Sequence, residues 1–165
     1  MSTGNLQVTT PTDREIAMTR VFDAPRRLVF DALTQPELLE RWYGPIGWKL
    51  VVCEIDLRVG GAFRLVSRRP HGKDIGQYGV YREIAAPERL VHTESWEDWN
   101  PGEVLVTIDL AEREGKTTYT CTMLYPSQEV RDTLIKSGMA DGATETYDKL
   151  AELLAALVEA PASAA

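Results

Sequence analysis

Seven segments of the chain have the apolar patterning and the β-branched or aromatic content of strands. The clearest is Glu103–Leu110, where Val104, Val106, Ile108 and Leu110 recur at every second position, as in a half-buried antiparallel strand. Turn residues such as glycine, proline and asparagine separate consecutive segments. The predicted strands are Glu15–Phe22, Trp48–Leu57, Ala62–Val66, Ile75–Ile84, Arg89–Trp96, Glu103–Leu110 and Thr117–Tyr125.

Two short helices are predicted between the first and second strands. Asp23-Ala24-Pro25 has the composition of a helix start, and the apolar residues that follow it form one helical stripe. Pro36 begins a second short helix that extends to Trp42, and Gly44-Pro45 ends it.

The last predicted element is a long amphipathic helix. Apolar residues keep helical spacing from the predicted N-cap Ser127 to Leu157, over about thirty residues. Gly138 and Gly142 lie in its middle, each at a cost of about 1 kcal/mol relative to alanine. They indicate a kink, or a close approach by another element or a ligand.

The order of elements predicts an α+β helix-grip fold. We expect a curved seven-stranded antiparallel sheet wrapped around the long C-terminal helix, with two short helices between strands 1 and 2. Residues 13–158 form this single domain, while residues 1–12 and 159–165 lack any periodic pattern and are predicted to be disordered tails. A curved sheet around a helix leaves space that side chains do not fill, and this space is the candidate site.

Charge excludes some partners. The 165 residues include 18 Lys and Arg against 25 Asp and Glu, a net charge of −7. Nucleic acids and anionic membranes favour clustered cations, so we expect neither as a partner. With no apolar run of the ~18 residues that a membrane span requires and no signal-peptide pattern, a cytoplasmic location is expected. Cys53 and Cys121 lack metal or redox spacing and are expected to be free thiols, with a disulfide as the alternative.

The sequence predicts neither a metal site nor a cofactor. His71 and His92 are the two histidines, and neither has a partner at ligand spacing. His92 and Glu94 share one strand face, so with Tyr81 they are candidates for acid–base catalysis in the cavity. The alternative is that they are ordinary packed or solvated strand residues.

All four tryptophans lie at the ends of predicted elements. Trp42 and Trp48 flank a Gly-Pro-rich loop, and Trp96 and Trp99 flank an acidic pair. Tryptophan is amphipathic and often lines a pocket opening, where its N–H reaches water. These rings therefore either line the cavity or close the ends of the sheet.

Six stretches of the chain, in order, resemble the START-like (Bet v 1-like, helix-grip) superfamily, and within it the activator of Hsp90 ATPase homologue 1-like family. They are Arg20–Pro25, Leu39–Pro45, Asp56–Phe63, Tyr78–Ile84, Pro87–Val91 and Gly138–Gly142. The resemblance implies a sheet around the C-terminal helix and an apolar cavity between them. It does not assign one activity, because members include lipid carriers, hormone receptors, polyketide cyclases and co-chaperone domains.

Two departures from the family pattern affect the prediction. Ala143 stands where many relatives have tryptophan, which implies a larger or differently shaped pocket. The twelve polar residues before the domain are too few for the separate N-terminal domain of the full Hsp90 activator, so an Hsp90 co-chaperone role is kept as an alternative.

We therefore predict non-catalytic binding of a small, largely apolar molecule. The alternatives are a protein-interaction domain of the Hsp90 co-chaperone type, and a cyclase, dehydratase or hydrolase that uses Tyr81, His92 or Glu94. An exposed edge strand also leaves a homodimer open. The predicted cavity residues are Trp42, Trp48, Phe63, Tyr78, Trp96, Met139, Ala143 and Tyr147.

Overall fold

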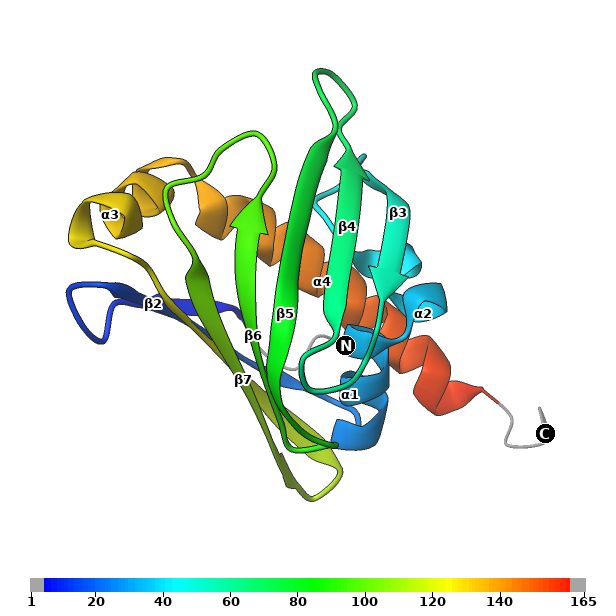
Figure 1. Ribbon diagram of the computed structural model, residues 1–165. Coiled ribbons are helices and arrows are strands. Elements are labelled where there is room, and N and C mark those ends of the chain that lie inside the picture. Colours follow the sequence, from blue (N-terminus) through cyan, green and yellow to red (C-terminus); the bar gives the residue numbers. More distant parts are fainter. Residues whose placement is uncertain (1–4, 161–165) are drawn as a thin grey trace.

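A computed structural model describes residues 5–160, which form one antiparallel sheet and four helices (Figure 1). The strands lie in the order β1-β2-β8-β7-β6-β5-β4-β3. Their bounds are β1 Gln7–Thr9, β2 Glu15–Phe22, β3 Lys49–Ile55, β4 Ala62–Arg68, β5 Ile75–Ala85, β6 Arg89–Trp96, β7 Val104–Arg113 and β8 Lys116–Leu124.

Helix α4, Met139–Glu159, lies across one face of the curved sheet, and the helices α1, Arg26–Thr34, and α2, Pro36–Trp42, pack beside it (Figure 1). Its apolar side turns Tyr147, Leu150, Leu153 and Leu154 into the core. A further contact joins the helix to the sheet, because the buried Arg20 guanidinium of β2 donates a 2.6 Å hydrogen bond to Asp148. The predicted α+β helix-grip fold is confirmed.

The sheet has one strand more than predicted. Strand β1 lies within residues 1–12, which the sequence assigned to a tail, and it pairs with β2 in the register Gln7↔Thr19. Three residues are too short to display a period of two, so the pattern gave no signal. Of the predicted tails, residues 1–4 and 161–165 lie outside the described residues, and Glu159 is the last residue of the C-terminal helix.

The predicted long C-terminal helix is in fact two helices. Helix α3, Gln128–Lys136, starts at the predicted cap, where the Val130 N–H donates to Ser127 Oγ at 3.2 Å. It ends before Gly138, whose φ of 80° lies in the left-handed region. Glycine adopts that conformation without a Cβ clash, so the chain turns at Gly138 before α4 begins.

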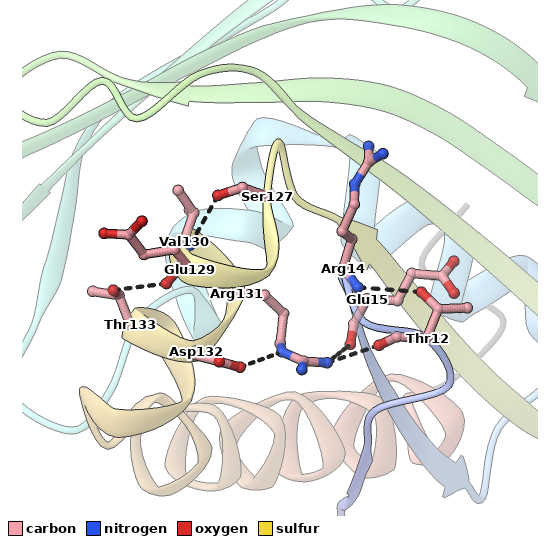
Figure 2. Close-up of polar contacts among 9 residues, drawn as sticks. All are labelled: Thr12, Arg14, Glu15, Ser127, Glu129, Val130, Arg131, Asp132 and Thr133. Atoms are coloured by element: carbon pink, nitrogen blue, oxygen red, sulfur yellow. Dashed lines mark hydrogen bonds and ion pairs between the residues drawn. The ribbon is translucent and has the colours of Figure 1, made fainter.

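One arginine of helix α3 donates hydrogen bonds to the β1–β2 connection (Figure 2). Arg131, the buried residue of α3, donates from Nη1 to the backbone carbonyls of Thr12 and Glu15, at 2.7 and 3.2 Å. Its Nε donates to Asp132 at 2.8 Å. The helix is therefore held on the β1–β2 connection by charge-assisted hydrogen bonds, in addition to the partly buried Val130 and Leu134, which pack against the core.

Candidate ligand-binding cavity

A cavity of about 530 Å³ lies between α4, α2 and the concave face of the sheet. Its walls are mostly aromatic and aliphatic side chains from β3 to β8, and the α3–α4 junction contributes Ser137, Gly138 and Met139. Pockets that hold small organic ligands have volumes of about 300–1,000 Å³ and mostly apolar walls with a few polar groups. This cavity has those dimensions and that composition.

The structure places seven of the eight predicted cavity residues around this space. They are Trp42, Trp48, Phe63, Trp96, Met139, Ala143 and Tyr147. Trp42 is fixed by a 2.9 Å hydrogen bond from its indole Nε1 to the Ala32 carbonyl, and its ring centroid lies 6.1 Å from that of Tyr147. The helix α2 and the helix α4 thus meet through two aromatic rings at the cavity wall.

Tyr78 does not belong to the cavity wall, and its prediction was wrong. Successive residues of a strand point to opposite faces, and in β5 the cavity side carries Gln77 and Tyr81. Tyr78 lies on the other face and is 42% exposed. The hydrophobic pattern did not reveal which of two adjacent residues faces the helix, because β5 has both glycines and large side chains.

Gly142 explains how α4 approaches the loop that follows α2. A Cβ at this position would lie 3.3 Å from Pro45 Cγ, and both residues border the cavity. Of the two glycines that the sequence singled out, Gly138 ends one helix and Gly142 permits this close packing. Both alternatives raised by the sequence, a kink and a close approach, therefore occur.

A chain of polar side chains runs along one wall. The Tyr43 hydroxyl donates to Gln77 Oε1 at 2.6 Å, and Gln77 Nε2 donates to Glu94 Oε1 at 3.1 Å. Burial raises the pKa of the Glu94 carboxyl from its ordinary 4.5 to about 7, and it raises the pKa of Tyr43 beyond its usual range. Near neutral pH, Glu94 therefore exists in both its protonated and its ionised form.

His92 lines the same cavity as a neutral ring. Its Nδ1 lies 2.9 Å from the Thr93 carbonyl, which can only accept, so the proton of the neutral imidazole belongs on Nδ1. Burial lowers the pKa of His92, and its ring meets the Phe63 ring edge to face at 5.1 Å. Tyr81, the third polar candidate, also lines the cavity.

Thiol and metal chemistry find no support in the described residues. Cys53 and Cys121 are free, and burial raises their pKa values to about 11 and about 12, so both are protonated at neutral pH. Within residues 5–160, no group of three or more His, Cys, Asp or Glu side chains could hold a metal ion.

Two residues of the polar chain, Tyr43 and Gln77, were missed by the sequence analysis. Gln77 has a signal in the sequence, because it precedes Tyr81 by four residues and so shares its strand face. Tyr43 has no such signal, since it follows the last residue of α2 and reaches β5 only through the tertiary fold.

The family model of the activator of Hsp90 ATPase homolog 1-like proteins matches residues 23–155 of this sequence. The chain belongs to this family. The match begins after β2 and ends within α4, so it includes every residue that lines the cavity except Met18 of β2.

Solved structures of similar proteins have the same fold. A crystal structure of a protein from Rhodobacter sphaeroides is similar to this chain, with 33% identity and a TM-score of 0.87 over 93% of this chain and 99% of that one. A protein from Nitrosomonas europaea has 27% identity and a TM-score of 0.82, over 92% and 100%. The AHSA1 protein from Silicibacter pomeroyi, with 20% identity and a TM-score of 0.69 over 86% and 97%, shares the fold.

No curated protein matches the chain. None of the helices within residues 5–160 is long and apolar enough to cross a membrane.

Proposed function

We propose that this protein binds a small, largely apolar molecule in the cavity between α4 and the sheet, without transforming it. The observation that carries the proposal is the cavity of about 530 Å³ with aromatic walls inside the core. Removing apolar surface from water contributes about 25 cal/mol per Å² before the costs of ordering are subtracted. An apolar guest of suitable size gains more from these walls than a polar one.

The polar residues of the cavity favour binding over catalysis. Acid–base catalysis requires two groups that converge on one reacting atom. His92 Nδ1 faces the Thr93 carbonyl of its own strand, and burial raises the pKa of Tyr81 above its ordinary 10, which makes that phenol a weak acid. Glu94 instead accepts from Gln77, which supports a role in orienting a bound molecule.

Native mass spectrometry of freshly purified protein, followed by thermal shift with an apolar compound library, tests the proposal. Ala143→Phe introduces a ring at the cavity wall, and Ala155→Phe introduces the same ring at an exposed position of α4. We expect co-purified or added ligands to stabilise the wild type and the Ala155→Phe control but not Ala143→Phe. If no compound stabilises the wild type, or if Ala143→Phe binds as well as the control, the proposal fails.

The family description gives a second candidate function, an interaction with Hsp90. That function requires an accessible surface rather than an open cavity. Stimulation of Hsp90 ATPase activity by the wild type, retained in Ala143→Phe, supports this candidate, whereas no stimulation at saturating protein excludes it.

A further inference from the structure

In the described part of the chain, the cavity contains an acidic side chain but no basic side chain that could neutralise its charge. Glu94 contributes a carboxyl, His92 contributes a neutral imidazole, and no lysine or arginine of the described chain lines the cavity. Two cations of the elements around the cavity have other partners, since Arg20 pairs with Asp148, and Lys149 lies 3.4 Å from the Pro45 carbonyl. A buried carboxyl without a cation is costly, because ionisation in an apolar site is unfavourable unless the charge is paired.

The hydrogen bonds that lead to Glu94 all run from donor to acceptor in the same direction. Tyr43 donates to Gln77, and Gln77 donates to Glu94, so the Gln77 amide is fixed by both neighbours and Glu94 is the terminal acceptor. Gln77 bonds to Oε1 of the carboxyl. A carboxylate has about four lone-pair sites, so Glu94 retains capacity to accept from a further donor.

We infer that the cavity selects an apolar molecule that carries one hydrogen-bond-donating group, an amine or a hydroxyl, and that Glu94 accepts that hydrogen bond. This inference rests on the proposed function and specifies its ligand. An ammonium group supplies the cation that the cavity lacks, and a hydroxyl group supplies a donor.

The same arrangement discriminates against free carboxylates such as fatty-acid anions. A carboxylate in this cavity would meet Glu94, a second acceptor that becomes anionic, and would find no arginine or lysine to pair with. Two carboxyl groups that share an apolar site cannot both ionise without a large penalty. Glu94 therefore provides selectivity in two ways, because it attracts hydrogen-bond donors and repels carboxylates.

Titration of Glu94 determines the conditions of the test. The other titratable groups that line the cavity with Glu94 are Tyr43 from the end of α2, Tyr119, Cys121 and Tyr125 from β8 and its end, Tyr147 from α4, Tyr81 from β5, and His92 on its own strand. Burial keeps all of these groups neutral at pH 8, whereas Glu94, with a pKa of about 7, is mostly ionised there. An amine should therefore bind more tightly as the pH rises from 6 to 8.

The experiment uses four probes with one apolar body. They are 1-adamantylmethylamine, 1-adamantylmethanol, the methyl ether of that alcohol, and 1-adamantanecarboxylate, each titrated by isothermal calorimetry at pH 6 and pH 8. Hydrogen bonds to charged groups contribute about 1.5–3 kcal/mol, which corresponds to roughly tenfold or more in affinity. At pH 8 we expect the amine and the alcohol to bind at least about tenfold more tightly than the carboxylate.

Variants locate the selectivity. Glu94→Gln keeps an acceptor and removes the charge, so it should weaken the amine while the alcohol still binds. Glu94→Leu removes the acceptor, so amine and alcohol should fall to the affinity of the methyl ether. Thr144→Val is the matched control outside the cavity, because Thr144 is exposed on α4 and its hydroxyl donates to the Ala140 carbonyl of its own helix. It should keep the wild-type selectivity.

The possible results separate the two claims. If all four probes bind with similar affinity, or if the carboxylate binds as tightly as the amine, the inference is wrong while the proposed apolar cavity stands. Unchanged selectivity in Glu94→Gln, which preserves the shape of the side chain should Glu94→Leu fail to fold, also overturns the inference. If none of the four probes binds, the inference fails together with the proposed function.

Discussion

The phenolic oxygens of Tyr119 in β8 and Tyr147 in α4 lie 2.5 Å apart in the core, so a buried hydrogen bond between two neutral side chains joins the sheet to the helix that it surrounds. The two rings are 5.1 Å apart, and the Phe22 ring packs against both of them. Both hydroxyl groups are buried, and burial raises the pKa values of both well above 10.

Tyr147→Phe should destabilise the fold by about 1–3 kcal/mol, because it leaves the Tyr119 hydroxyl with only the weakly bonding Cys121 thiol nearby. Removing both hydroxyl groups, in the double variant with Tyr119→Phe, should cost less than the sum of the single changes. Urea unfolding of the four proteins measures this coupling. Additive effects would show that the two hydroxyl groups do not interact.

The pH dependence of stability should report Glu94. Its pKa is about 7 in the folded state and about 4.5 when exposed, so between these values the folded protein retains a proton that the unfolded chain has released. Stability therefore falls as the pH rises from 4.5 to 7, by on the order of 3 kcal/mol, and stays lower above pH 7. Glu94→Gln should lack this loss and be more stable than the wild type at pH 8.

The comparison of wild type with Glu94→Gln isolates this carboxyl. His92 has a lowered pKa, so its contribution is lost as the pH falls below about 6.5, and this opposite slope is the same in both proteins. Chemical unfolding at several pH values gives the difference curve. Parallel curves for the two proteins would contradict the raised pKa.

Two glycines of β5 should respond differently to alanine. A Cβ at Gly79 would overlap with the backbone carbonyl of Thr93 and lie 2.6 Å from the Phe63 ring, and neither group can move without disturbing the sheet or the core. A Cβ at Gly76 would meet only the Glu97 side chain, which is partly exposed and can rotate away. We expect Gly79→Ala to cost about 2 kcal/mol or more and Gly76→Ala less than about 1 kcal/mol. Thermal unfolding compares them, and equal losses would be contrary to this prediction.

Arg131→Met should loosen α3 without unfolding the sheet. The variant keeps the aliphatic part of the side chain but removes the donors to the Thr12 and Glu15 carbonyls, at a cost of about 1–3 kcal/mol. Hydrogen exchange of the α3 amides should become faster than in the control Lys136→Met, which changes an exposed residue of the same helix. Identical exchange in both variants would mean that Arg131 does not hold the helix.

The periodic elements could be predicted closely from the sequence. Glu15–Phe22, Arg89–Trp96 and Pro36–Trp42 have the predicted bounds in the structure. The strands are bounded by turn residues on both sides, and the helix begins with a proline, which is favoured at the first helical position. These signals are local, so they depend little on the rest of the fold.

The division of the C-terminal helix could not be predicted from composition. A glycine inside a helix costs only about 1 kcal/mol, so Gly138 is compatible with both a continuous helix and a left-handed turn. Tertiary packing decides between the continuous helix and the turn. Arg131 holds α3 on the β1–β2 connection, whereas the apolar side of α4 packs into the core. That choice depends on contacts between residues more than a hundred positions apart.

The cavity wall could be predicted only in part, because it too depends on contacts between residues far apart in the sequence. Large aromatic residues at element ends indicated a hollow, and most of them lie around it. The face of β5, which separates Gln77 from Tyr78, is determined by pairing with β6, where Gln77 lies opposite Trp96. A shift of one residue reverses the two faces, so a sequence pattern weakened by glycines does not resolve it.

The contacts of Arg131 have a consequence for how this chain tolerates change. The guanidinium binds carbonyl oxygens at positions 12 and 15, which every amino acid provides, so replacing the side chains of Thr12 or Glu15 leaves both acceptors in place. Inserting or deleting a residue between them would instead move one acceptor away from the other. The β1–β2 connection is thus free to vary in composition but constrained in length.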